Sequence, residues 1–302
     1  MNYDIGDRAV QIDPQMLEQL ATSKTTWTVQ QDDLLRYAAA ARDFNKIHYD
    51  AAAAKAFGFD RPIAHGMLNL GLVLARVADI VGVDAISSST TRFSAPAYVG
   101  AEVTLAFEST GTNGLVATIT NDGGKPVLNT QIGLREQGQA SADYKRPVGE
   151  LVAERWVVVE QGPATRFAAT LGAVSDVFHR KDAAKAAGFD SIPVLATYGF
   201  VLPSWGFFPE LEGNETATMP DTVGDCQEWA QTQGAVAHAG QGFTHSKPLL
   251  VGDLVHSQTL VVNRASKQRG ERTLRFTDVH SILTDSAGAH ILTSAMTLVA
   301  SD

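Results

Sequence analysis

The chain has 302 residues, of which 44% are hydrophobic and 19% charged, so it is long enough for two domains and can bury a core. Its net charge of −9 argues against a nucleic-acid partner, although a few local cations could still hold a phosphorylated ligand. The one cysteine, Cys226, excludes an intrachain disulfide and fits a reducing compartment. With no signal-like start and no apolar run of spanning length, we expect a cytoplasmic protein without membrane contact.

The first part of the chain predicts short elements around a polar segment. One strand is expected at Thr25–Val29. Asp32 and Asp33 precede an Ala/Leu-rich run, which is typical of a helix start, and this helix should end near Ala41. A second, shorter helix is expected over residues 50–57, because Gly58 then stops it.

A wide apolar face predicts a buried helix from Ala64 to Val81. The period then changes to that of strands, which we expect over four segments separated by turn residues: 87–94, 102–110, 115–120 and 126–135. One long buried helix followed by an antiparallel run of strands predicts a sheet wrapped around that helix.

The second half repeats the first. Residues 37–67 align without gaps on residues 167–197, at a constant offset of 130, and a Lys-Ala-x-Gly-Phe-Asp segment recurs in both. The polar residues 137–149 are expected to form a linker between a first domain, 1–136, and a second domain, 150–302. A buried helix at 194–205 and strands at 256–264, 272–283 and 290–299 should complete the second domain.

The candidate site follows the first of the three helices predicted for the first half. Asp43, Asn45 and His48 place a carboxylate, an amide and an imidazole within six residues, and Gly66 follows at the start of the buried helix. This set is typical of acid–base chemistry. At the offset of 130 the second half has Ala173, Ser175, Phe178 and Ala196 instead, which predicts one site per chain.

The motif Asp43-x-Asn45-x-x-His48, followed by residues 63–67, resembles the signature of the MaoC-like hot-dog hydratases. These include (R)-specific 2-enoyl-CoA hydratases and related 3-hydroxyacyl dehydratases. Residues 92–100 resemble the strand that follows their central helix, and the second half is similar to the degenerate half of two-hot-dog dehydratases. Two departures are Arg42 and Lys46, where the family usually has Gly and Pro.

The resemblance implies an α+β fold, a double hot-dog with two antiparallel sheets side by side, each wrapped around a long central helix. It implies hydration of trans-2-enoyl-CoA to (R)-3-hydroxyacyl-CoA, or the reverse dehydration. It also implies a homodimer that binds acyl-CoA as its substrate. An acyl-carrier-protein dehydratase, a non-catalytic acyl-thioester-binding subunit and a hot-dog thioesterase are the alternatives. No separate cofactor is implied.

Hydration needs a base for the attacking water, a proton for C2 and donors for the thioester oxygen. Asp43 and His48 are expected to act as a coupled pair on one water, with Asn45 orienting it. The backbone N–H of Gly66, at a helix start, would stabilise the oxygen. Each residue also has a plainer interpretation, since an Asp at a helix end is commonly a cap.

The remaining expectations concern binding. Arg92 could meet a CoA phosphate, although a solvated charge is the commoner case. His65, Met67 and Phe178 are expected to line the substrate pocket, and the insertion at residues 203–234 should help to admit a long or bulky acyl chain. The eight histidines show no HExxH or short paired spacing, so no metal site is expected.

Overall fold

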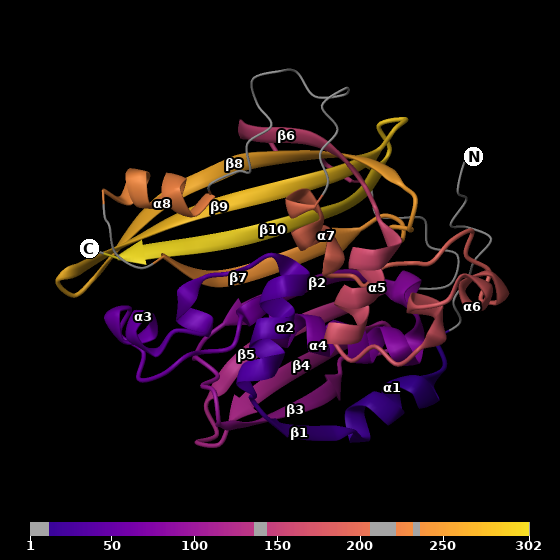
Figure 1. Cartoon of the computed structure of the whole chain (residues 1–302), viewed down its shortest axis with the longest axis horizontal. Helices are drawn as coiled ribbons and strands as arrows, with labels where there is room; N and C mark the ends of the chain where they lie inside the picture. The colour runs from indigo at the N-terminus through magenta and orange to yellow at the C-terminus, as the bar shows by residue number, and fades with distance from the viewer. Residues whose placement is uncertain (1–11, 136–143, 206–221, 232–235, 302) are drawn as a thin grey trace.

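The computed structural model describes residues 12–135, 144–205, 222–231 and 236–301. The first half contains nine of the elements labelled in Figure 1 and two 3₁₀ helices. In chain order they are α1 (Pro14–Thr22), β1 (Lys24–Thr28), α2 (Gln31–Ala41), η2 (Lys46–His48), α3 (Ala51–Ala56), α4 (Gly66–Val81), η3 (Val83–Ala85), β2 (Ile86–Phe93), β3 (Glu102–Ser109), β4 (Gly114–Asn121) and β5 (Pro126–Leu134).

The second half repeats most of this order, without a counterpart of α1 and with the additional helix α8. Its elements are β6 (Glu150–Val158), α5 (Gln161–Thr170), η4 (Asp176–Phe178), α6 (Lys181–Ala186), α7 (Tyr198–Val201), η5 (Leu202–Ser204), α8 (Thr222–Ala230), β7 (Val236–His245), β8 (Leu254–Arg269), β9 (Arg272–Asp285) and β10 (His290–Ser301). The predicted repeat is visible here, because η4 and α6 begin 130 residues after η2 and α3.

All ten strands form one antiparallel sheet in the order β1-β3-β4-β5-β2-β7-β10-β9-β8-β6. The order of the second half mirrors that of the first, and β2 pairs with β7 at the centre. Thr90 pairs with Gly242, which is also its counterpart 152 residues later, at the spacing that relates the bridge residues Tyr98 and Leu250. A pseudo-two-fold axis therefore passes through this strand pair, and the side-by-side double sheet predicted from the sequence is confirmed.

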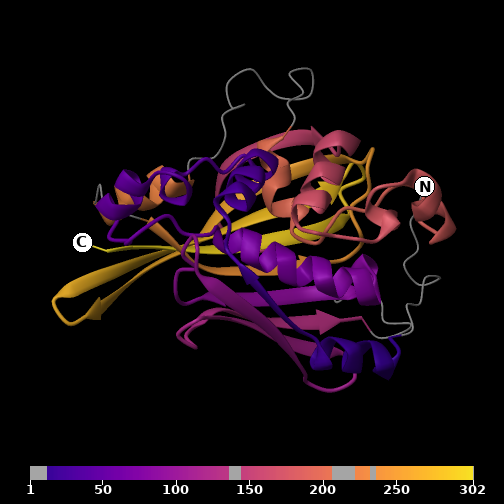
Figure 2. The same cartoon turned by 60° about the horizontal axis from the view of Figure 1, so that its bottom comes forward.

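Helix α4 is the core of the first half. Eleven of its sixteen residues are buried, so it has almost no solvent-facing side, as the wide apolar face predicted. Each buried Leu or Val stabilises the fold by about 1.5–3 kcal/mol. Gly71 lets α4 approach the end of α5, since a Cβ there would lie 2.7 Å from a methyl carbon of Leu171. Figure 2 shows α4 lying between the sheet of the first half and the helices α2 and α5.

The prediction of a second long central helix was wrong. Over the expected segment 194–205 the chain forms only the four-residue helix α7 and the 3₁₀ helix η5. Pro203 lies inside this segment, and proline removes a backbone donor and clashes with the preceding turn of an α-helix. The two halves therefore share a sheet plan but differ in the helix that each sheet covers.

Two segments predicted from the sequence lie partly outside the described residues. Positions 137–143 of the predicted linker and most of the insertion at 203–234 lie outside them, so the domain limits and the role of the insertion stay predictions. The strands of the first half agree with their predicted ranges to within two residues. The sequence did not predict α1, β6, β7 or the helix α8 within the insertion. No helix among the described residues is long and apolar enough to cross a membrane.

Candidate active site

The site begins where α2 ends at a strained residue. Arg42 has a left-handed backbone with φ 57°, and its counterpart in the second half, Gly172, has φ 67°. A side chain in this region costs roughly 1 kcal/mol that glycine avoids. Two contacts oppose that cost: Nη1 of Arg42 donates to the carbonyl of Ser204 at 2.8 Å, and its guanidinium lies 5.3 Å from the Trp205 ring.

Two side chains then shape the loop. The Asp43 carboxylate accepts a hydrogen bond from the backbone N–H of Asn45 at 3.2 Å. The Asn45 amide oxygen accepts from the N–H of Ile47 at 3.3 Å and so caps η2. In the second half the Ser175 hydroxyl accepts from Val177 at 3.4 Å in the same way. The change from Asn to Ser therefore keeps the turn, and the structure gives Asn45, which is exposed, a capping contact.

The imidazole of His48 is held in one tautomer. Its Nδ1 lies 2.8 Å from the carbonyl oxygen of Ile63, and a carbonyl can only accept, so Nδ1 carries the proton. This leaves the lone pair on Nε2, as a general base requires. His48 is 7% exposed, and it reaches this position because η2 turns it back toward the strand bridge at Ile63.

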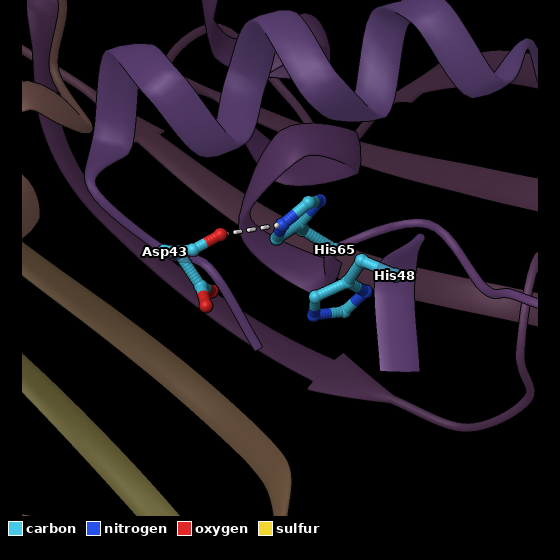
Figure 3. Close-up of side chains that lie close together, drawn as sticks. All are labelled: Asp43, His48 and His65. Carbon is cyan, nitrogen blue, oxygen red and sulfur yellow. Dashed lines mark hydrogen bonds between the residues drawn. The ribbon is translucent and has the colours of Figure 1, made fainter. Parts of the chain in front are cut away.

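His65 joins the loop to the central helix. Its Nε2 lies 3.2 Å from the backbone carbonyl oxygen of Asp43, and its ring stacks on that of His48 with centroids 3.6 Å apart. Figure 3 shows both rings beside Asp43, with the dashed line marking the bond from His65 to the Asp43 carbonyl. One ligand-type atom from each of the three side chains lies within 4.8 Å of the others.

Burial controls the charge of both histidines. It lowers the pKa of His48, while the Ile63 carbonyl and the Asp43 carboxylate act in the opposite direction. It lowers the pKa of His65 to about 4, with the neighbouring His48 adding to the effect. Both rings are therefore neutral near pH 7, so Nε2 of His48 can accept a proton there.

The same three side chains could in principle coordinate a metal ion. However, Nδ1 of His48 and Nε2 of His65 already bond to carbonyl oxygens, and Nδ1 of His65 is buried without a partner. Two ring nitrogens are therefore left for a ligand or a proton, Nε2 of His48 and the buried Nδ1 of His65. That the site uses no metal or cofactor stays a prediction.

Helix α4 starts at Gly66, directly after His65. The first N–H groups of a helix have no acceptor within it, so they can bind an oxygen that carries negative charge. A Cβ on Gly66 would lie 3.0 Å from an edge carbon of Phe93, so the Phe93 ring closes one side of this helix start.

A residue from the second half also reaches this region. The ring of His238 on β7 lies 5.0 Å from that of Phe93 and 5.9 Å from that of Phe200, and its Nε2 is buried without a hydrogen-bond partner. Burial lowers the pKa of His238 to about 4, and the charge of Asp43 acts on it in the opposite direction. Sequence reasoning missed His238, because only the pairing of β2 with β7 brings it beside Phe93.

The other predicted residues lie in different surroundings. Met67 is buried in the core of α4, and Phe178 is buried on η4, where His48 lies in the first half. Arg92 is exposed on β2 opposite Gly240, so its contact with CoA stays a prediction.

A cavity of about 440 Å³ runs beside α4, and none of His65, Met67 and Phe178 lines it. Its walls come from both halves, with Leu68 and Leu72 on one side and Leu171 on the other. Ala64, which precedes His65 in the chain, also lines it.

Two known families match the chain in turn. Residues 14–130 match the MaoC like domain, and residues 146–294 match the FAS1-like, dehydratase domain region. The chain therefore combines a MaoC-like dehydratase domain with a FAS1-like dehydratase region in one double hot-dog.

Each of three curated relatives matches less than half of this chain. A UPF0336 protein of Clavibacter michiganensis is 29% identical over 133 residues, which is 44% of this chain and 78% of that protein. An (R)-specific enoyl-CoA hydratase of Aeromonas caviae is 36% identical over 80 residues, 26% of this chain and 60% of the relative. A 3-hydroxyacyl-thioester dehydratase X of Mycobacterium tuberculosis is 40% identical over 86 residues, 28% of this chain and 30% of the relative.

Solved structures match over the whole fold. A MaoC domain protein from Chloroflexus aurantiacus superposes with a TM-score of 0.64 at 12% identity, over 92% of this chain and 95% of that one. A Mycobacterium tuberculosis protein described as a double hot-dog gives 0.59 at 10% identity, over 92% and 94%. At such identities the likeness shows the shared fold.

Proposed function

We propose that this protein hydrates a trans-2-enoyl thioester to the (R)-3-hydroxyacyl thioester, or catalyses the reverse dehydration, at one site per chain. One observation carries the proposal: His48 has its Nδ1 proton bound to Ile63, so its Nε2 lone pair is free beside the Asp43 carboxylate. This is the arrangement that a general base for water requires. In the second half alanine and phenylalanine occupy the two positions.

In the proposed reaction a water lies between Asp43 and His48. As its oxygen bonds to C3 of the substrate, Nε2 of His48 accepts its proton, and the electron pair of the double bond moves toward the thioester oxygen. The first N–H groups of α4, beginning at Gly66, stabilise that oxygen. A proton then returns to C2 from the same pair, which completes the addition with atoms and charge balanced.

The choice of CoA as the thioester handle is supported by the match to the Aeromonas caviae hydratase, which is named for enoyl-CoA. A carrier-protein thioester offers the same reacting atoms, so it remains the second candidate. The 440 Å³ cavity beside α4 supports a long acyl chain, because its volume lies in the range of small-molecule pockets. Faster turnover of crotonyl-CoA than of long-chain enoyl-CoAs would contradict that part of the proposal.

The test follows the loss of enoyl-thioester absorbance with the wild type, Asp43→Asn and His48→Ala. General acid–base groups typically contribute about 10²- to 10⁴-fold to rate, so we expect kcat to fall by about that factor in both variants, with circular dichroism unchanged. Undiminished activity in either variant removes that residue from its role. Release of free thiol by the wild type would instead indicate a thioesterase, and acyl-CoA binding without any turnover would indicate a binding subunit.

A further inference from the structure

The second half carries a strand extension that the first half lacks. In the first half, β3 and β4 are joined after Ser109 by four residues. Their counterparts β8 and β9 continue to pair as far as Arg269 and Arg272. We call residues 263–278 the basic hairpin. In Figures 1 and 2 its tip projects beyond the end of the sheet, at the end of the molecule where α3 lies.

The hairpin is strongly cationic in an acidic protein. It holds five cations, which are Arg264, Lys267, Arg269, Arg272 and Arg275, and two acids, Glu271 at the turn and Asp278 at the base. Arg264 pairs with Glu150 at 3.3 Å. Lys267, Arg269 and Arg272 are exposed, and none of them forms an ion pair within the described part of the chain.

The strand register places these three cations on one face. Lys267 and Arg269 are two residues apart on β8 and so lie on the same face, and Arg269 lies directly opposite Arg272. Like charges in opposite positions of an antiparallel pair are destabilising. This arrangement of charges does not stabilise the fold. An anionic partner is the simplest group that would offset the repulsion between the three cations.

The base of the hairpin lies level with the active site. Thr277 on β9 pairs with Leu298 on β10, which in turn pairs with His238 on β7. Two strand spacings, about 10 Å, therefore separate the hairpin base from the histidine beside Phe93. From there the hairpin extends outward by about 20 Å, at the rise of roughly 3.3 Å per residue typical of strands.

We propose that the basic hairpin docks an acidic carrier protein that presents the acyl thioester to this site. The inference rests on the proposed function and adds a second handle, because a carrier and CoA present the thioester on the same phosphopantetheine arm. A charged face spread along an extended arm fits the spread carboxylates of a protein surface better than the compact phosphates of one CoA. Its main effect is on association, since complementary charge raises encounter rates by about 10- to 10³-fold at low salt.

The test compares the wild type with the triple variant Lys267→Glu/Arg269→Glu/Arg272→Glu on three crotonyl thioesters: a holo acyl carrier protein, CoA and N-acetylcysteamine. We expect kcat/KM for the carrier to fall about tenfold or more at low ionic strength, and the difference to shrink as salt is added. Turnover of the other two thioesters should change less than twofold.

The matched control is Lys125→Glu/Lys181→Glu/Lys185→Glu, which changes the net charge equally at exposed lysines outside the hairpin. Two of these lie on α6, at the opposite end of the molecule in Figure 1. An equal loss in this control would overturn the proposal, because bulk charge would then be the cause. An equal loss with crotonyl-CoA would also overturn it, by assigning the hairpin to CoA phosphates.

A wild type that neither binds nor uses the crotonyl carrier overturns the docking proposal. Turnover of the N-acetylcysteamine thioester tests the chemistry separately, since this substrate has neither a carrier nor phosphates. If that turnover is absent, the proposed function fails. Fluorescence anisotropy of the labelled holo carrier then still measures whether the hairpin binds it.

Discussion

The rings of His48 and His65 stack at 3.6 Å, and each ring donates a hydrogen bond from one nitrogen to a backbone carbonyl. The two acceptors are Ile63 and Asp43, so the pair joins the loop from Asp43 to His48 to the segment that leads into α4. Because burial keeps both rings neutral, they can stack without repulsion. The geometry of the proposed base thus depends on a second histidine that does no proton transfer in the proposed reaction.

The pKa of His48 provides the first prediction. Burial lowers it, so His48 stays neutral at pH values somewhat below 6.5, and the acid limb of kcat/KM should lie below that value. The charge of Asp43 raises this pKa, so Asp43→Asn should lower it further. An NMR titration of the His48 ring proton measures this even in an inactive variant. Asp32→Asn, at an exposed position of α2, is the control, and a rise in the pKa with Asp43→Asn would contradict the assignment.

Asn45 can be tested against its counterpart Ser175. Both cap a 3₁₀ helix, so Asn45→Ala and Ser175→Ala should each lower the free energy of unfolding by about 1 kcal/mol. Asn45→Ser should retain the cap and therefore the stability. If Asn45 also orients water, Asn45→Ser will lower kcat while urea denaturation shows no loss. Full activity in Asn45→Ser would limit Asn45 to its capping role.

Gly66 tests the helix start. A Cβ there would lie 3.0 Å from Phe93, so Gly66→Ala should crowd the site where the thioester oxygen is expected to bind. We expect kcat/KM to fall by roughly tenfold or more, since loss of one oxyanion donor typically costs about 10²-fold or more. Phe93→Leu in the same chain should restore part of it, because it removes the ring that the new methyl meets. Equal activity of Gly66→Ala and the wild type would exclude this oxygen site.

Arg42 tests the strain at the end of α2. Its left-handed backbone favours glycine, so Arg42→Gly should be more stable than Arg42→Ala by about 1 kcal/mol in urea denaturation. Both variants lose the contacts with Ser204 and Trp205, so the comparison isolates the backbone. Gly172→Ala should lose about the same amount in the second half. Equal stability of the two Arg42 variants would mean that the loop relaxes without strain.

The first half was predicted well because local periodicity fixes its elements. The apolar face of α4 and the alternation in β2 to β5 are local signals, and so is the Asp43 to His48 motif. The second half was harder. Pro203 interrupted a helix that the repeat predicted, and the glycines Gly240 and Gly242 lowered the strand signal of β7. The end of β8, residues 265–269, was also missed, because these residues are mostly polar.

The site itself shows what sequence spacing cannot supply. The motif predicted Asp43 and His48, but not that Ile63 selects the His48 tautomer or that His65 stacks upon it. His238 lies 190 positions from His48 in the chain, and only the strand pairing reveals it.

The pairing of Thr90 with Gly242 has a consequence for how the site persists. Because one chain supplies both strands, the contact between the halves is intramolecular, and its formation depends on an effective local concentration rather than on how much protein is present. Dilution cannot separate His238 from Phe93. A site shared between separate subunits is lost when dilution separates them. The covalent link between the two halves of this chain prevents that loss.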